Sequence, residues 1–424
     1  MKKSNKYKKI IIAIIATACV CAGVVTYAYV TTEVRTSQPP AVSFASQTAT
    51  PASSLWVEPV LGGLLTKSIN ETSNIETFDL GTITVKALPM EIQEGLETLL
   101  TVSTEGTSIF QGTTEEYREF NFSQNGQYEV TLNVVSPKST DISRGEFIYK
   151  FSFILDVQPK ILFSSDKALQ GDILAVYVNN GFMTEHPIID TDFGEPVFLP
   201  LSADEYIAYV PINYSKSIGK YAITVSLGEI KKTQSIIVTE RNYSVQHMTV
   251  SNETTQATMN NPKGPDNWAT RIKVLWNTYD EEKYWTDTFI QPCFARISTE
   301  FGLYRYTNNN PNPSRHTGID IAANPDTPVQ ASNAGRVVRA EEIIYTGNTV
   351  VIEHGGSLKT YYYHMNSLDV KEGDMVERGQ IIGKVGSTGY STGAHLHFEV
   401  KMGSNSLSPW ELFDGTSKIY FMGE

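Results

Sequence analysis

Two hydrophobic patterns follow one another along this chain of 424 residues. Residues 10–30 form a run of 21 residues without a charged side chain, and five lysines lie among the nine residues before it. A run of about 20 apolar residues is long enough to cross a bilayer as a helix. We therefore predict a cytoplasmic tail over 1–9 and a transmembrane helix over 10–30. From about Trp56 onward, apolar and polar residues alternate instead, which predicts strands.

The apolar run predicts an uncleaved signal anchor. Lysines ahead of a span favour a cytoplasmic N-terminus, which places the rest of the chain outside the membrane. A cleavable signal has a shorter apolar core of about 7–15 residues, so cleavage after Ala28 or Ala45 is the alternative. Residues 31–55 are rich in Thr, Ser, Ala and Pro, and we predict that they form a linker without a fold.

Alternation with period two predicts antiparallel sheets over residues 83–87, 128–134 and 147–155. A weak repeat accompanies it, because Gly126-Gln-Tyr128 recurs 93 residues later as Gly219-Lys-Tyr221. In each copy one further strand ends the unit. This arrangement resembles tandem immunoglobulin-like sandwiches, each with a tyrosine-corner candidate. Chance recurrence is the alternative, since the chain has 22 tyrosines.

The expected fold is mainly β, with a linking helix. We expect immunoglobulin-like domains over 56–157 and 158–240, a connector over 241–288 and a C-terminal antiparallel β domain over 289–424. A helix is predicted over 266–284, capped by Asp266. Its apolar positions recur every three or four residues and should pack against a neighbouring domain.

Charge and cysteine content exclude two classes of function. The formal net charge is −12, so nucleic acid would be repelled. Three cysteines are too few for a disulfide framework.

Candidate chemistry gathers in the last quarter of the chain, where five of the seven histidines lie between positions 316 and 397. In a strand over 394–401, His395 and His397 share one face, while Leu396 and Phe398 point to the other. Extended backbone would likewise place His316 and Asp320 on one side. Two imidazoles and one carboxylate are the ligand set of an open catalytic zinc site. The surplus histidines then suit acid–base roles.

These motifs resemble the M23 (lysostaphin/LytM-type) zinc endopeptidases over about residues 289–412. The matching elements are Phe301-Gly302, His316-x-Gly318-x-Asp320, Thr327-Pro328-Val329, Gly335-Arg336-Val337, Tyr362-x-His364, Gly373-Asp374-x-Val376-x-x-Gly379-Gln380, Ser391-Thr392-Gly393 and His395-x-His397. The family usually has Pro where this chain has Ala394. The resemblance leaves the N-terminal two-thirds of the chain uncovered.

The resemblance implies a role for each histidine of the motifs. His316, Asp320 and His397 would bind one Zn²⁺ per catalytic domain. His364 and His395 would be the catalytic pair, and the sequence leaves open which of them is the general base.

Three further expectations concern neighbouring groups. His354 is expected to support a hairpin. Glu399 either orients an imidazole or faces solvent, and we favour the solvent-facing interpretation. Because the zinc ligands all lie within 289–424, we also expect that fragment to fold alone.

The resemblance and the apolar run together imply a membrane-anchored metalloendopeptidase that hydrolyses peptide bonds of bacterial peptidoglycan on the cell-wall side. Its partners would be the peptidoglycan peptide and the membrane, and a regulatory protein partner is left open. One rival is a non-enzymatic scaffold or hydrolase activator that uses the C-terminal domain for docking. Another is a wall-binding protein whose sandwiches carry the function.

Overall fold

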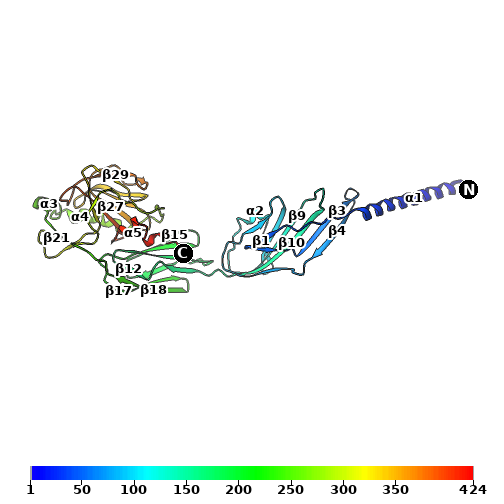
Figure 1. Cartoon of the computed structure of the whole chain (residues 1–424), viewed down its shortest axis with the longest axis horizontal. Coiled ribbons are helices and arrows are strands. Elements are labelled where there is room, and N and C mark those ends of the chain that lie inside the picture. The colour runs from blue at the N-terminus through cyan, green and yellow to red at the C-terminus, as the bar shows by residue number, and fades with distance from the viewer. Residues whose placement is uncertain (1, 424) are drawn as a thin grey trace. The chain divides into compact units, whose positions relative to one another are not determined.

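The computed structural model describes residues 2–423 of the chain. It divides into two compact units, residues 1–158 and 159–424. Apart from the N-terminal helix the chain is built mainly of strands, most of them paired antiparallel (Figure 1). The prediction of a mainly β protein with an N-terminal apolar helix is confirmed.

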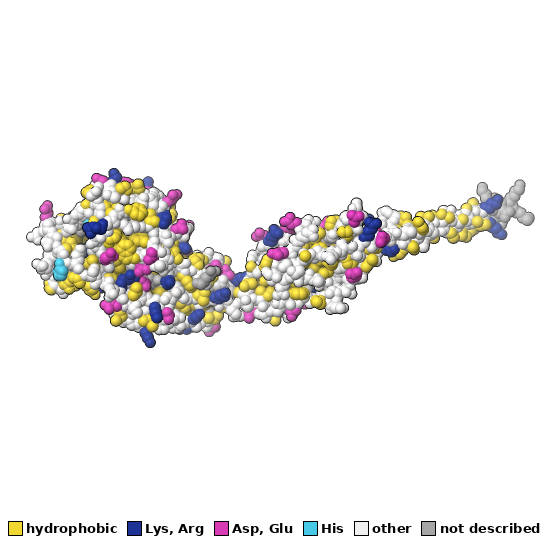
Figure 2. Space-filling view, viewed as in Figure 1, with side chains coloured by type: hydrophobic (Ala, Val, Ile, Leu, Met, Phe, Trp, Pro, Cys, Tyr) yellow, Lys and Arg dark blue, Asp and Glu magenta, His cyan; other side chains and the backbone are white. Residues whose placement is uncertain are grey.

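The first unit begins with helix α1 (Lys2–Thr31). Its segment Tyr7–Thr31 is long and apolar enough to cross a membrane, and the most apolar part of this segment is not buried inside the protein. Hydrophobic side chains cover the helix in Figure 2. A membrane anchor and a signal sequence both meet this description.

The strands of the first unit form a three-stranded sheet in the order β2-β1-β6 and a seven-stranded sheet in the order β4-β3-β10-β9-β7-β8, with β5 parallel to β10. Their bounds are β1 Val42–Phe44, β2 Gln47–Ala49, β3 Ser53–Val60, β4 Leu65–Thr72, β5 Phe78–Ile83, β6 Met90–Ile92, β7 Glu97–Thr104, β8 Thr107–Gly112, β9 Gly126–Ser136 and β10 Arg144–Leu155, with the short helices η1 Leu61–Gly63 and α2 Thr114–Tyr117. The alternating apolar residues of β9 and β10 are all buried, as expected.

Two expectations for this unit are corrected. Residues 42–55 are not an unfolded linker, because β1, β2 and the start of β3 lie there and Val42 and Phe44 are fully buried. The alternation after Ile83 is not a strand. Strand β5 pairs with β10 up to Ile83, which lies opposite Leu155 at the end of β10, and Val85 is exposed.

The second unit begins with a β-sandwich of two four-stranded sheets, in the orders β11-β13-β16-β15 and β12-β18-β17-β14. One apolar core lies between them. The bounds are β11 Lys160–Phe163, β12 Lys167–Leu169, β13 Ile173–Asn179, β14 Ile188–Thr191, β15 Phe198–Pro200, β16 Glu205–Pro211, β17 Gly219–Leu227 and β18 Ile230–Thr239.

Both repeat tyrosines make the same local bond. The hydroxyl of Tyr128 donates to the Gln124 carbonyl and that of Tyr221 to the Ser217 carbonyl, each at 2.8 Å and four residues upstream. This is the bond that defines a tyrosine corner. The repeated Gly-x-Tyr pattern therefore marks one strand start in each unit.

The connector differs from the expected helix. It contains β19 (Val245–Met248), α3 (Asn252–Ala257), α4 (Gly264–Arg271) and the 3₁₀ helix η2 (Lys273–Asn277). Helix α4 begins after Lys263, without a side-chain cap, and Asp266 lies inside its first turn together with Pro265, a position where proline fits well. After η2 the chain is extended, and Lys359 and Arg336 bond Thr278 and Asp280.

The C-terminal part forms a ten-stranded sheet with the central order β20-β23-β30-β27-β26-β25-β28. The strands are β20 Arg296–Thr299, β23 Ile319–Ala322, β24 Pro328–Gln330, β25 Gly335–Ile343, β26 Gly347–Glu353, β27 Leu358–Leu368, β28 Met375–Val376, β29 Ile381–Val385, β30 Leu396–Met402 and β31 Asn405–Leu407. Beside it β21 (Tyr304–Thr307) pairs with β19 and β22 (Ser314–Arg315). The short helices α5 Trp410–Phe413 and η3 Lys418–Tyr420 follow.

The sandwich and the C-terminal sheet share a hydrophobic core. Ile207 and Tyr209 of the sandwich belong to the same buried cluster as Trp285, Leu358 and Phe398. A fragment of residues 289–424 would expose this apolar face, so the structure argues against the expectation that it folds alone. The second unit, residues 159–424, is shorter than the full chain and keeps this core intact.

Candidate metal centre

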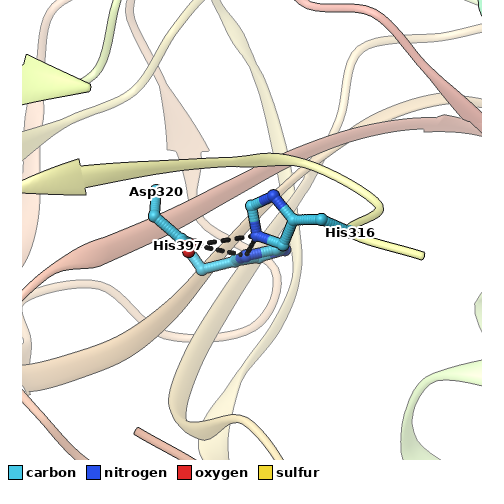
Figure 3. Close-up of side chains that lie close together, drawn as sticks. All are labelled: His316, Asp320 and His397. Atoms are coloured by element: carbon cyan, nitrogen blue, oxygen red, sulfur yellow. Dashed lines mark hydrogen bonds and ion pairs between the residues drawn. The ribbon is translucent and has the colours of Figure 1, made fainter. Parts of the chain in front are cut away.

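Three side chains meet on one face of the C-terminal sheet. His316 Nε2 lies 2.9 Å from Asp320 Oδ1 and 3.0 Å from His397 Nδ1, and His397 Nδ1 lies 2.9 Å from Asp320 Oδ1. All three residues are buried, and their candidate ligand atoms lie within 4.8 Å of one another. Figure 3 shows the two imidazoles and the carboxylate converging from separate strands and a loop.

Strand register brings two of these residues together. In the antiparallel pair of β23 and β30, Asp320 lies opposite His397, and in the pair of β30 and β27, His397 lies opposite Tyr363. Directly opposed residues on neighbouring strands have their Cβ atoms about 4.5–5.5 Å apart. The tyrosine ring consequently stacks flat against the His397 imidazole, with centroids 5.3 Å apart and planes at 5°.

Gly318 allows β23 to approach β30 this closely. A Cβ at this position would lie 2.1 Å from the carbonyl oxygen of Phe398 and 3.0 Å from His397 Nε2. The His-x-Gly-x-Asp motif therefore has a glycine at this position because the gap between the strands leaves no room for a Cβ atom.

Backbone bonds fix the ring orientation of His316. Its Nδ1 lies 2.9 Å from the carbonyl of Glu300, and because a carbonyl only accepts, Nδ1 carries the proton. Its Nε2 therefore presents a lone pair to the cluster. A metal-binding imidazole is typically held in this way by a bond from its other nitrogen.

Burial and charge act in opposite directions on the ionisable groups. Burial by itself would raise the pKa of Asp320, but the charges and hydrogen bonds of His316 and His397 outweigh it and hold this pKa well below its usual range. Burial lowers the pKa of His397. Both shifts are in the direction that metal binding requires, since a metal is bound by an ionised carboxylate and by neutral imidazoles.

Two further histidines lie next to the cluster. The rings of His364 and His395 have their centroids 4.8 Å apart, and His395 Nε2 lies 3.7 Å from Asp320 Oδ1. His364 Nδ1 bonds the Thr388 carbonyl and His395 Nδ1 bonds the Gly393 carbonyl, both at 2.8 Å. Both rings therefore carry their proton on Nδ1 and keep a free lone pair on Nε2. Burial and the neighbouring imidazoles lower the pKa of His364 to about 3.

The backbone at His364 explains how this side chain reaches the site. Tyr362 lies in the core, so simple alternation would send His364 to the core face as well. Instead His364 has a φ of 62° at a register shift in β27. This left-handed conformation is uncommon for residues other than glycine and turns the imidazole to the face of His397.

A buried polar network lies behind His397. Glu399 is 2% exposed, which corrects the solvent-facing interpretation. Its carboxylate accepts bonds from Lys401 Nζ at 2.6 Å, Ser406 Oγ at 2.9 Å and the Tyr363 hydroxyl at 3.3 Å. Burial opposes its ionisation, but the Lys401 charge lowers its pKa. The period-two pattern that places His395 and His397 on one face also puts Glu399 there, whereas nothing in the sequence indicated Tyr363.

Arg305 is a residue that sequence reasoning missed. Its guanidinium Nη2 donates to Asp320 Oδ2 at 2.9 Å, and both side chains are largely buried. The contact depends on how β21 lies beside the sheet, for which the sequence carries no signal.

His354 is fully buried away from the cluster. Its Nδ1 bonds the Ala334 carbonyl at 2.7 Å and its Nε2 bonds the Thr360 hydroxyl at 2.8 Å. Burial lowers its pKa to about 4. These contacts join the segment before β25 to β27 and agree with the expected structural role.

The cluster opens into a groove. A cavity of about 480 Å³ is lined by His316, His364 and His397, by Tyr214 of the sandwich and by Trp276 of the connector. The site is therefore accessible to a ligand and is built partly by segments that precede the C-terminal sheet.

The family comparison agrees with this geometry, because residues 314–409 match the model of peptidase family M23. The chain carries an M23 domain at its C-terminus. The matched segment contains all five histidine and aspartate residues of the cluster and its neighbours. The recognition made from the sequence is confirmed at the level of the family.

Two known proteins similar to part of this chain are named as endopeptidases. Peptidoglycan DD-endopeptidase ShyA of Vibrio cholerae is 43% identical over 105 residues, which are 25% of this chain and 24% of that protein. DD-carboxypeptidase/endopeptidase Mpg of Neisseria meningitidis is 40% identical over 121 residues, 28% of each chain. The matches thus span about a quarter of these relatives.

Among solved structures, the catalytic domain of lysostaphin from Staphylococcus simulans is 36% identical. The match covers 27% of this chain and 90% of that one, with a TM-score of 0.25.

Proposed function

We propose that this protein is a zinc-dependent endopeptidase that hydrolyses peptide bonds of cell-wall peptidoglycan. The observation that carries the proposal is the convergence of His316, Asp320 and His397 beside an open groove, with two more histidines next to them. The similarity to peptidoglycan DD-endopeptidase ShyA supports the substrate class.

The donor set fits zinc. Two neutral imidazoles and one carboxylate leave a fourth position open, as in catalytic rather than structural zinc sites. When bound, zinc lowers the pKa of its water to about 7 and polarises a carbonyl. Its ligands would be His316 Nε2, one oxygen of Asp320 and His397 Nδ1, the atoms that already face one another.

His364 and His395 would move the proton. Each holds its Nδ1 proton against a backbone carbonyl and keeps Nε2 free, so each can accept a proton at Nε2 and return it. One would take the proton of the attacking water, and the other would steady the developing charge on the scissile carbonyl or protonate the leaving amine. Both Nδ1 atoms bond a backbone carbonyl at 2.8 Å, so these bonds do not distinguish the two roles.

We further propose that helix α1 anchors the protein in the membrane, with the M23 domain on the cell-wall side. Support comes from the apolar segment Tyr7–Thr31 and from the lysines that precede it. This location would place the groove in the compartment of its proposed substrate.

The test is metal-dependent hydrolysis by the purified full chain in detergent. We expect one zinc per chain, and release of soluble peptides from purified peptidoglycan that stops after chelation and returns when zinc is added. A protein that binds zinc and peptidoglycan but releases no peptide would instead be the non-enzymatic scaffold considered above.

A further inference from the structure

The two oxygens of the Asp320 carboxylate face different partners. Oδ1 lies 2.9 Å from both His316 Nε2 and His397 Nδ1, whereas Oδ2 accepts a bond of 2.9 Å from Arg305 Nη2. The side chains of Arg305 and Asp320 are 19% and 8% exposed, so water screens this ion pair little. One oxygen thus faces the candidate metal position and the other is occupied.

Arg305 is itself held in place by the connector. Its Nε donates to Gln246 Oε1 at 2.8 Å, and the parallel pairing of β19 with β21 sets Gln246 beside Arg305. Two nitrogens of the guanidinium, Nε and Nη2, therefore engage two acceptors at once. Both residues precede the matched family segment 314–409.

Occupation of Oδ2 limits how the carboxylate can bind a metal. A free carboxylate can offer one or both oxygens to a cation. A charge-assisted bond to arginine is about twice as strong as a neutral hydrogen bond, and it competes for the second oxygen. With Oδ2 engaged, the cluster offers three ligand atoms and keeps a position open for water.

We propose that Arg305, oriented by Gln246, is a positioning residue that keeps Asp320 a one-oxygen ligand of the catalytic metal. The inference rests on the metal site of the proposed function. It extends the machinery of that site into the connector, which supplies Gln246.

The test uses the full chain in detergent and the metal alone as a probe. Arg305→Gln removes the charge, Gln246→Ala removes only the orienting acceptor, and Arg296→Gln is the control because Arg296 is exposed on β20. Zinc affinity is measured by competition with a chelating dye. Visible absorption of the Co²⁺-substituted protein reports coordination number, because added ligands weaken the absorption of a four-coordinate Co²⁺ site.

We expect Arg305→Gln to lower zinc affinity by about 10–100-fold and to weaken the Co²⁺ absorption as Oδ2 becomes free. Gln246→Ala should also lower the zinc affinity and the Co²⁺ absorption, but by less than Arg305→Gln does. Arg305→Lys should retain part of the affinity that Arg305→Gln loses. Arg296→Gln should match the wild type.

Two results would overturn the inference separately from the proposed function. A wild type that binds zinc, together with an Arg305→Gln protein of unchanged spectrum and affinity, contradicts the inference alone. If Arg305→Gln does not fold, an unchanged spectrum in Gln246→Ala contradicts it. A wild type that binds no zinc overturns the proposed function and this inference with it.

Discussion

Replacement of Gly318 by alanine tests the contact between β23 and β30. The added Cβ would lie 2.1 Å from the Phe398 carbonyl oxygen, where ordinary contact begins at 3.4 Å. The strands must therefore separate locally by about 1 Å, because backbone cannot rotate away as a flexible side chain can. Asp320 and His397 lie opposite each other on these strands, so the separation acts directly on the metal centre.

Two consequences follow from this displacement. Overpacking a close contact costs about 1–3 kcal/mol of unfolding free energy. Each kcal/mol corresponds to a fall of about 2–4 °C in Tm for a unit of this size. A shift of about 1 Å between catalytic groups can lower the rate about 100-fold. Zinc content should fall because the ligand atoms no longer converge.

The assay is thermal unfolding and zinc content of Gly318→Ala beside a matched control. Gly393→Ala is suitable, because a Cβ there meets nothing within 4 Å and the carbonyl of this glycine bonds His395 next to the cluster. The control should keep the Tm and the zinc of the wild type. A Gly318→Ala protein with unchanged Tm and full zinc would show that the strand contact does not govern the site.

Four further outcomes are expected. His397→Ala should lose zinc and hydrolysis together, whereas His395→Ala should keep zinc while the rate falls about 10²–10⁴-fold, as measured by metal analysis and peptide release. A fragment of residues 159–424 should be soluble and show cooperative unfolding, whereas 289–424 should aggregate or unfold, because it lacks the sandwich and connector residues that complete its core. The full chain should stay in the membrane fraction after a high-salt wash, and mature soluble protein would contradict the anchor. The pKa of His354 is about 4 in the folded protein and about 6.5 when unfolded. The neutral, buried imidazole therefore contributes about 3 kcal/mol to the free energy of unfolding above pH 6.5, and this contribution is lost as the pH falls to 4. In His354→Gln, the free energy of unfolding should decline less steeply between about pH 6.5 and 4.

The strand signals that were predictable from the sequence share one cause. Period-two alternation reports burial on one face, and it located β9, β10 and β30 together with the shared face of His397 and Glu399. Where a segment is a strand because it pairs with a distant strand, the alternation pattern did not predict the strand or predicted its end wrongly. Residues 42–55 look like a linker by composition but complete a sheet in the first unit. Val85 continues the alternation, but its strand has already ended beside β10.

The candidate site also combines features that the sequence predicted with features that it did not. A spacing of four residues in extended backbone predicted that His316 and Asp320 share one side, whereas their convergence with His397 depends on the register of β23 and β30. The conformation of His364 was not predictable, since alternation would place it in the core and only a positive φ turns it to the site. Arg305 was not predictable for a different reason, because its position depends on pairing with β19 of the connector.

The central claim is that the groove hydrolyses a peptide bond of peptidoglycan. The most direct measurement is mass spectrometry of the products that the zinc-loaded full chain and its His395→Ala variant release from peptidoglycan of defined composition. We predict wild-type fragments that carry a new amine and a new carboxyl at one peptide bond, heavier by one water in sum, and far fewer of them from the variant. Intact stem peptides and cross-links after incubation with zinc-loaded wild type, or equal fragments from both proteins, would contradict the account.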